Sequence, residues 1–407
     1  MNEDIKILFI CGVFAKENEE EVVKQSKKGV EFSANQMQLK FINAFCHIAP
    51  TKVISAPFIG HYPNQSHTLH FCGFSNEQQL CEYIRFNNIW GVSNISRAYA
   101  MKKAVRDFAL QKDGKKLIVV YSAHYPFLAA ATYAKALDPD IKVCCIVPDL
   151  PQYMNLEKKR SALYNLFKKI DVKSIEKKMG EIDTSVVLTN AMAHILHLDD
   201  RPYIVSEGLV DCLPKEINLN NQDEIINIVY AGKIYFKFGI KLLIDAFSSF
   251  ENTNYRLVLC GTGDAAEYVK KCANEDPRII FIGQVSPDEV QKYINRATVL
   301  VNPRPNNGEY TKYSFPSKNI EYLSSGKPTV AFLLDGMPKC YQNFLYTVDD
   351  QKGDSVCALS DALKAAISAS KEEFEKRHAL FVKYASENLL TSAVAEKIIR
   401  MNFDEEA

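Results

Sequence analysis

The chain has 407 residues, more than a single hydrophobic core usually serves, so its length predicts two domains. It carries 49 basic and 49 acidic residues, and this balance gives no global case for nucleic-acid binding. Eleven cysteines without a CxxC pair or a zinc-like Cys/His spacing favour a reducing cytosol. The acidic start Met1–Asp4 is the opposite of a signal peptide, and no apolar run reaches the roughly 20 residues that span a bilayer. We therefore expect a cytoplasmic protein.

The first half of the chain alternates strand-like and helix-like stretches. Ile5–Gly12 is a continuous apolar run that ends in glycine, which is typical of a buried parallel strand. Ser33–Ala49 has helical apolar spacing. The further strands expected here are Thr51–Ile59, Leu117–Ala123, Lys142–Val147 and Ser185–Leu188, with helices at Ala98–Leu110 and Ala129–Leu137. Such alternation predicts a doubly wound α/β sheet.

Three residues lie where loops leave this predicted sheet. His124 follows one strand and Asp149 follows the next, and the carboxyl ends of parallel strands share one edge of a sheet. Gly29 lies between the first strand and the first helix, where glycine permits either a close approach or a simple flexible turn. A polar residue at a strand end is also an ordinary turn or cap residue. Both interpretations therefore stay open for His124 and Asp149.

The stretch Leu156–Met179 is basic and amphipathic. Its apolar residues recur at helical intervals, and they are Leu163, Leu166, Phe167, Ile170, Ile175 and Met179. Lysines and Arg160 crowd the remaining positions. Such a helix either lies on an anionic membrane surface, where each near-surface cation contributes about 1 kcal/mol, or packs its apolar face on its own sheet.

The second half repeats the alternation after a polar, aperiodic linker around Asp211–Glu224. Its expected strands are Ile226–Ala231, Tyr255–Cys260, Arg278–Ile282, Thr298–Asn302 and Pro328–Leu334. Its expected helices are Ile240–Phe250, Asp264–Asn274 and Pro287–Ala297, and the end of the chain, Lys371–Phe403, is also helical. We therefore expect an N-terminal Rossmann-like domain over residues 1–212 and a second one over residues 213–384.

The stretch Val301–Ala331 carries the strongest functional pattern. It continues from a strand end through a loop of Pro, Asn and Gly residues into a helix. Three residues that suit a helix cap or first turn mark the helix start: Ser314, Pro316 and Ser317. Gly326 fits a left-handed C-cap, and Pro328 prevents the helix from continuing.

This helix predicts an anion site. Its N-terminus, at Ser317, would face out from the carboxyl edge of a parallel sheet, where free N–H groups and the helix dipole favour phosphate. Lys318 adds a positive charge in the first turn. Glu321, about one turn deeper, can accept hydrogen bonds from a sugar diol or simply complement the helix dipole. The pattern indicates a cradle for a nucleotide-sugar.

The segment Phe315–Pro328 (FPSKNIEYLSSGKP) resembles the donor-site signature of retaining GT-B glycosyltransferases, most closely the family 4 enzymes of bacterial capsular and exopolysaccharide synthesis. The resemblance implies two Rossmann-like domains facing each other across a cleft. It also implies a last helix, at about residues 385–407, that crosses back to the first domain. In such enzymes the helix glutamate, here Glu321, binds the donor ribose. The family's second glutamate, eight positions earlier, is replaced by Tyr313, for which Glu309 is the candidate substitute.

A second loop resembles the family's cationic diphosphate loop. Gly232–Gly239 (GKIYFKFG) follows a predicted buried strand, and the two cations of such a loop neutralise the donor diphosphate. Here they are Lys233, where arginine is commoner, and Lys237, which falls one place earlier than usual. Together with Lys318 they would stabilise the leaving diphosphate.

Other donor-side residues follow from the same resemblance. Main-chain groups at Gly283, Gln284 and Val285 are where related enzymes read the base. Gly261-Thr262-Gly263 is a GxG fragment, a weak phosphate signal that is often just a tight turn. Arg304 is expected to hold the loop that follows it or to contact the acceptor, or else to lie on the exposed surface.

The implied reaction moves a hexose-type sugar from a UDP-linked donor to a glycan or lipid-linked saccharide, with retention and without a metal or other cofactor. Related enzymes often have a His/Asp cluster near the transferred sugar. Here Asp149 is the candidate base and the histidine of that motif is absent. His124 and Gly29 are assigned to the acceptor side. A GT-B epimerase and a non-catalytic partner subunit remain alternatives, the second because of Tyr313.

Overall fold

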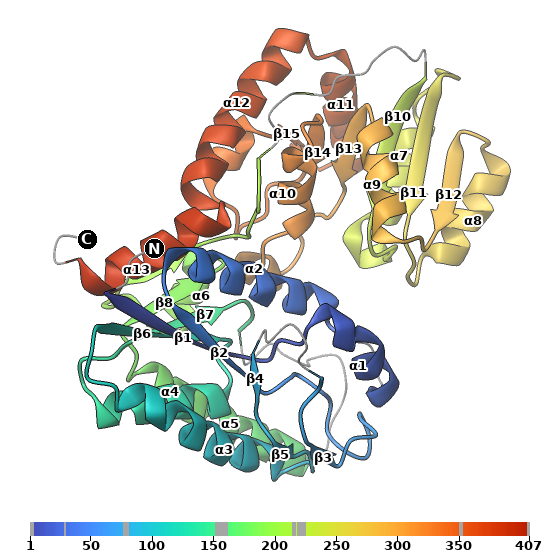
Figure 1. Cartoon of the computed structure of the whole chain (residues 1–407). Coiled ribbons are helices and arrows are strands. Elements are labelled where there is room, and N and C mark those ends of the chain that lie inside the picture. Colours follow the sequence, from blue (N-terminus) through green and yellow to red (C-terminus); the bar gives the residue numbers. More distant parts are fainter. Residues whose placement is uncertain are drawn as a thin grey trace. The chain divides into compact units, whose positions relative to one another are not determined.

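The computed structural model describes residues 4–27, 30–75, 81–150, 162–213, 217, 225–349 and 353–404. They form two compact units, Met1–Asp211 with Thr391–Ala407, and Cys212–Leu390 (Figure 1). The first unit ends at Asp211, where residue 212 was predicted. The chain returns to it at Thr391, later than the predicted residue 385.

The first unit is built on a seven-stranded sheet in the order β4-β2-β1-β6-β7-β8-β9. Its strands are β1 (Ile5–Cys11), β2 (Thr51–Ser55), β4 (Glu82–Tyr83), β6 (Lys115–Tyr121), β7 (Lys142–Val147), β8 (Thr184–Val187) and β9 (Tyr203–Val205). All neighbouring pairs are parallel, and the order reverses between β1 and β6, which makes this the topological switch point. A separate ribbon pairs β3 (His70–Phe71) with β5 (Phe86–Asn87).

Helices cover both faces of this sheet, which explains the continuous apolar strands (Figure 1). One face packs against α2 (Phe32–Ile48) and α13 (Thr391–Phe403), whose apolar side chains join those of β1 in one core. The other face carries α3 (Ser93–Ala109), α4 (Tyr125–Leu137) and α5 (Ala162–Met179). The short helices α1 (Glu19–Gln25) and α6 (Asn190–Ile195) complete the unit.

The predicted bounds of this unit need three main corrections. Helix α3 begins at Ser93, five residues before the predicted Ala98. The second strand, β2, ends at Ser55 rather than Ile59. Ala56 still donates to the Cys11 carbonyl at 3.0 Å, but Pro57 after it has no N–H to continue the ladder. Helix α4 begins at Tyr125, four residues before the predicted Ala129, with Pro126 in its first turn, where a missing N–H costs nothing.

The second unit has a six-stranded parallel sheet in the order β12-β11-β10-β13-β14-β15. Its strands are β10 (Ile226–Ala231), β11 (Tyr255–Cys260), β12 (Ile279–Gly283), β13 (Val299–Asn302), β14 (Thr329–Ala331) and β15 (Tyr346–Thr347). The order reverses between β10 and β13. The sequence predicted β10 and β11 with the observed bounds.

The helices of the second unit follow the strands. They are α7 (Ile240–Ser248), α8 (Ala266–Glu275), α9 (Pro287–Arg296), α10 (Ser317–Ser324), α11 (Ser355–Ser368) and α12 (Lys371–Asn388). The predicted helical end Lys371–Phe403 is two helices, α12 and α13, separated at Leu389 and Leu390, and they belong to different units. Helix α11 was not predicted. No helix within the described ranges is long and apolar enough to cross a membrane.

Candidate functional site

The switch point of the second unit lies where β10 and β13 separate. Their ladder pairs Ile228 with Val299 and Val229 with Leu300. At the end of β10, the N–H of Ala231 donates to Tyr322 Oη at 2.9 Å, and Tyr322 Oη donates to the Ala231 carbonyl at 3.1 Å. A side chain of α10 is therefore bonded to the last residue of the central strand.

Helix α10 has the N-terminus that the sequence predicted as an anion site. Its N-cap residue is Pro316, which supplies no side-chain acceptor, so no side chain caps the first N–H groups. Ser317 is the first helical residue and is exposed. Gly326 has φ 68° directly after the C-cap Ser325, as its predicted left-handed role requires.

Lys318 lies against the loop that follows β10. A Cβ on Gly232 would lie 2.2 Å from Lys318 Cε and 3.0 Å from its Nζ, so a larger residue there would have to displace the end of the lysine side chain. Burial lowers the pKa of Lys318, and the carboxylate of Glu321 acts in the opposite direction. The side chain of Glu321 is exposed. The first turns of α10 thus present one cation and one free-standing carboxylate on the same side of the unit.

The two glycine loops fit tightly together. Gly261 has φ 134°, and a Cβ there would lie 1.7 Å from the Gly232 carbonyl oxygen. Its N–H donates to the Gly283 carbonyl at 2.7 Å, and the Gly232 N–H donates to Cys260 at 2.8 Å. These N–H groups already have acceptors. The Gly261 end of the GxG fragment is therefore a tight turn against Gly232, and its role as a phosphate contact stays a prediction.

The cations of the Gly232–Gly239 loop have different surroundings. Lys233 has an exposed side chain, while its carbonyl accepts a hydrogen bond from Tyr230 Oη at 2.9 Å. Lys237 is also exposed, and its Nζ lies 5.7 Å from the ring centroid of Tyr235 and 5.5 Å from that of Phe238. Lys233 is thus the cation whose backbone is held by a buried side chain of β10.

Arg304 holds its own loop, which was one of the roles expected for it. Its Nη2 donates to Ser314 Oγ at 2.9 Å, and its guanidinium lies 5.3 Å from the ring centroid of Tyr310 and 5.6 Å from that of Phe238. Ser314 donates in turn to the Tyr310 carbonyl at 3.1 Å. Ser314 is therefore a loop residue and not the helix cap that its position suggested.

The remaining donor-side residues lie around this centre. Gln284 and Val285 follow β12, between Gly283 and the capping box at the start of α9. Tyr313 and Glu309 are the two ends of a 3-10 helix, and Glu309 is exposed. The second unit thus brings together the ends of β10, β11 and β12 with the start of α10.

In the first unit, His124 lies at the carboxyl edge, directly before α4. Its ring centroid is 4.9 Å from that of Phe127 and 5.9 Å from that of Phe58. Its Nδ1 atom is buried and has no hydrogen-bond partner among the described residues. Burial and the nearby positive charges of Arg97 and His61 lower the pKa of His124 to about 3, so the imidazole is neutral at physiological pH.

Asp149 lies at the same edge, two residues after β7. Burial and the neighbouring carboxylate of Glu31 raise its pKa. Gly29 is outside the described residues. The close-approach glycine at this edge is Gly12, where a Cβ would lie 2.5 Å from the ring of Phe58.

Arg97 was not predicted as a site residue, and it is 3 % exposed on α3. Its Nη2 donates to the carbonyls of Pro57 and Ile59 at 3.4 Å, and its guanidinium lies 4.1 Å from the ring centroid of Phe86. It therefore holds the segment that carries Phe58 against His124. The one sequence signal that could have predicted a buried Arg97 is its position on the apolar side of α3.

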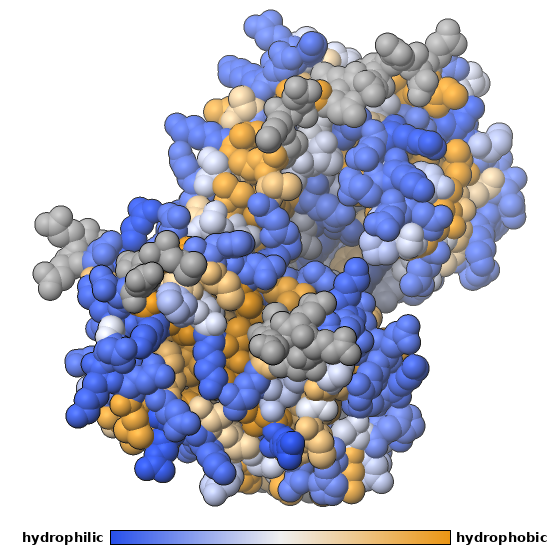
Figure 2. All heavy atoms as spheres, in the orientation of Figure 1, coloured by the Kyte–Doolittle hydropathy of each residue, from blue (hydrophilic) through white to orange (hydrophobic). Residues whose placement is uncertain are grey.

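The predicted amphipathic stripe is divided on α5. Ile175 and Met179 are buried, whereas Phe167 is 48 % and Ile170 is 53 % exposed. Phe167 contacts the ring of Trp90, itself 43 % exposed, at a centroid distance of 5.6 Å. Leu156–Ser161, with the cations Lys158, Lys159 and Arg160, lies outside the described residues. Hydrophilic residues cover most of the face shown in Figure 2, with smaller hydrophobic areas between them.

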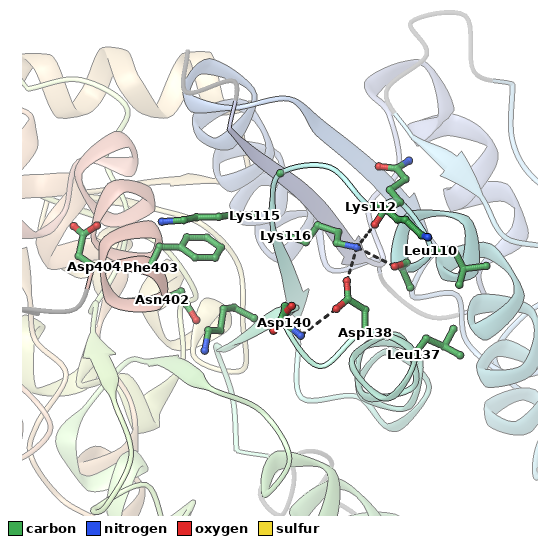
Figure 3. A pocket seen from close by; sticks show the side chains of 14 residues that line it. Leu110, Lys112, Lys115, Lys116, Leu137, Asp138, Asp140, Asn402, Phe403 and Asp404 are labelled. Atoms are coloured by element: carbon green, nitrogen blue, oxygen red, sulfur yellow. Dashed lines mark hydrogen bonds and ion pairs between the residues drawn. The ribbon is translucent and has the colours of Figure 1, made fainter.

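A pocket of about 880 Å³ in the first unit lies at the opposite, amino-terminal end of the sheet (Figure 3). Lys116 is 5 % exposed there and bonds to the Asp138 carboxylate and to the carbonyls of Ala109 and Gln111 near the end of α3. Lys115 extends beside the ring of Phe403. Lys116 therefore serves to hydrogen-bond carbonyls near the end of α3. Ligands of doubly wound sheets bind at the opposite, carboxyl edge, so this pocket is not the expected ligand site.

Comparisons with known proteins agree with this architecture. Residues 226–368, within the second unit, match the family model described as glycosyl transferases group 1. The chain is 26 % identical over 193 residues to the lipopolysaccharide 1,2-N-acetylglucosaminetransferase of Salmonella typhimurium. That match covers 42 % of this chain, and the chain spans about half (48 %) of the length of that curated relative.

Solved structures cover nearly the whole chain. The lipopolysaccharide outer core galactosyltransferase WaaB aligns with a TM-score of 0.63 and 13 % identity over 98 % of this chain and 99 % of its own. Anabaena HepE in complex with UDP aligns with a TM-score of 0.60 and 12 % identity, over 97 % of this chain and 98 % of its own. A Rickettsia africae glycosyltransferase aligns with a TM-score of 0.60 and 12 % identity over 100 % of both chains. The chain therefore has the GT-B glycosyltransferase fold, and the match to the group 1 glycosyltransferase model is confined to residues 226–368.

Proposed function

We propose that the protein is a glycosyltransferase of the retaining, family 4 type. It would transfer a hexose-type sugar from a UDP-linked donor to a glycan or lipid-linked saccharide during surface polysaccharide synthesis. The observation that carries the proposal is the N-terminus of α10, with Lys318 and Glu321 beside the Gly232-Lys233 loop at the β10/β13 switch point. The relatives add support, since one is named a lipopolysaccharide N-acetylglucosaminetransferase and one solved structure holds UDP.

In the proposed reaction the glycosyl–phosphate bond breaks while negative charge grows on the leaving diphosphate. Lys233, Lys237, Lys318 and the first N–H groups of α10 would stabilise this charge without a metal ion. Glu321 would bind the ribose, and Ser317, Gln284 and Val285 would complete the donor contacts. Arg304 would fix the loop that precedes α10 through its bond to Ser314.

On the first unit we assign the acceptor to the carboxyl edge. Asp149 is the proposed base for the acceptor hydroxyl, because a carboxyl with a raised pKa is a better proton acceptor once it is ionised. His124 is neutral and packs against Phe58 and Phe127, so it would form part of an uncharged aromatic surface on the acceptor side.

The direct test is a calorimetric screen of nucleotides followed by a product assay. We expect UDP to bind more tightly than other nucleoside diphosphates, and a UDP-hexose to be hydrolysed slowly to UDP when no acceptor is present. Sugar isomerisation would instead identify an epimerase. Binding of UDP without release of a product, in the presence of candidate acceptors, would identify a non-catalytic subunit. Activity that survives EDTA would support the metal-independent mechanism.

We also propose that α5 contacts an anionic membrane surface. Phe167, Ile170 and Trp90 form an exposed apolar group beside the lysines of this helix. Replacing Lys158, Lys159, Lys168 and Lys169 by Gln should release the protein from anionic vesicles, whereas Gln at Lys270 and Lys271 on α8 should not. Equal binding by both variants, or salt-insensitive binding, would favour a helix that merely packs on its own unit.

A further inference from the structure

Tyr322 occupies a position that the donor contacts proposed above do not explain. Along β10, successive residues direct their N–H and C=O groups to alternate neighbouring strands. The N–H of Gly232 donates to the Cys260 carbonyl of β11. The N–H and C=O of Ala231, one residue earlier, therefore face the opposite side, where β13 lies. The β10–β13 ladder has already ended at Val229 and Leu300. Without another partner, both backbone groups of Ala231 would be left unpaired in a buried place.

The Tyr322 hydroxyl replaces the missing strand. It accepts from the Ala231 N–H at 2.9 Å and donates to the Ala231 carbonyl at 3.1 Å. The Tyr322 side chain is 0 % exposed, and Ala231 is 2 % exposed. Burial raises the pKa of Tyr322 well above its ordinary value, so the hydroxyl keeps the proton that the second bond needs. One side chain of α10 therefore satisfies both backbone groups at the end of the central strand.

The bond connects the two parts of the proposed anion site. Tyr322 is on the same helix as Lys318, whose Nζ lies 5.9 Å from the Tyr322 ring centroid, and as Glu321. Ala231 immediately precedes Gly232 and Lys233. A second buried hydroxyl, that of Tyr230, holds the Lys233 carbonyl at 2.9 Å. A third polar contact joins α10 to β13, since Asn302 Nδ2 donates to Asn319 Oδ1 at 2.7 Å.

We propose that Tyr322 is a positioning residue for the donor diphosphate, whose hydroxyl sets the first turns of α10 in register with the Gly232-Lys233 segment. It touches no substrate and acts through Lys233 and Lys318. The inference rests on the proposed function, because it assumes that the two elements bind one diphosphate. A tyrosine that merely filled the core would need its ring but not its hydroxyl.

The test is Tyr322→Phe, which keeps the ring and removes both bonds. We expect UDP affinity to fall about 10-fold, because the unpaired Ala231 groups draw the loop away from α10. The matched control is Tyr346→Phe, at a buried tyrosine of β15, which is separated from β10 by two strands. It should lower thermal stability at most and leave UDP affinity unchanged. Equal UDP affinities of Tyr322→Phe and the parent protein would overturn the inference.

A double-mutant cycle separates positioning from general loss of stability. Tyr322→Phe and Lys233→Ala should lose less UDP affinity together than the sum of their separate losses, since the first acts through the second. Additive losses would overturn the proposal. If Tyr322→Phe does not fold, Tyr230→Phe replaces it in the same cycle, with the same expectation and the same contradicting result. A parent protein that binds no UDP would refute the proposed function, whereas normal binding with an unaffected variant would refute only the positioning role.

Discussion

The two switch points of this protein have the same topology and opposite chemistry. In the second unit, the point between β10 and β13 is surrounded by Lys233, Lys318 and an uncapped helix N-terminus. In the first unit, the point between β1 and β6 is lined by the ring of Phe58 and by the neutral imidazole of His124. The topology of the doubly wound sheet therefore determines where a ligand can bind, and the side chains at that edge determine whether the ligand is charged or neutral.

This difference teaches how the two units divide the proposed reaction. Exposed cations and backbone N–H groups suit a diphosphate, whose charge must be met in the ground state and more strongly in the transition state. An aromatic surface with a buried neutral His and a carboxyl of raised pKa suits an uncharged saccharide and the transfer of a proton. Four substitutions test whether each edge depends on the groups that distinguish it.

The largest effect is expected from Gly261→Ala in the second unit. Alanine at φ 134° is strained, and its Cβ would lie 1.7 Å from the Gly232 carbonyl oxygen. We expect a loss of about 3 kcal/mol in the free energy of unfolding and no measurable UDP binding. The matched control is Gly283→Ala, since Gly283 has φ 78° but no atom within 4 Å of a Cβ. It should lose only about 1 kcal/mol in urea unfolding, and equal losses would refute the close-approach argument.

The second test removes a cation. Lys233→Ala should reduce turnover more than it raises the Michaelis constant for the donor, with a total loss on the order of 100-fold, because the diphosphate gains charge as the glycosyl bond breaks. Lys318→Ala should lose less, since the N–H groups of α10 share its task, and the double variant should be less than additive. A rise in the Michaelis constant alone would make Lys233 a ground-state binding contact.

The third test concerns the exposed carboxylate. Glu321→Ala should weaken UDP binding about 10-fold in calorimetry, because hydrogen bonds from the ribose hydroxyls to a charged acceptor are lost. Its fold should persist, since the Glu321 side chain is exposed. Glu309→Ala is the informative companion. If Glu309 replaces the family's missing glutamate, its loss should lower turnover while UDP binding persists.

The sequence predicted the framework better than the contacts. The apolar runs of β10 and β11 and the stop at Gly326 could be placed because burial and backbone conformation leave a local pattern. Ser314 could not be told from a cap, since its partner Arg304 lies ten residues earlier. Tyr322 was part of the recognised motif, yet its bond to Ala231 depends on the end of a ladder between two strands far apart in the chain.

The smallest effect on stability is expected from Asp149→Asn in the first unit. Burial and Glu31 raise the pKa of this carboxyl in the folded protein above its value in the unfolded chain. Between the two pKa values the folded state binds more protons, so stability falls as pH rises through this window. Asparagine removes the ionisation, and the variant should therefore be more stable than the parent at pH 7. The difference should vanish at a pH below the unfolded pKa of about 3.9.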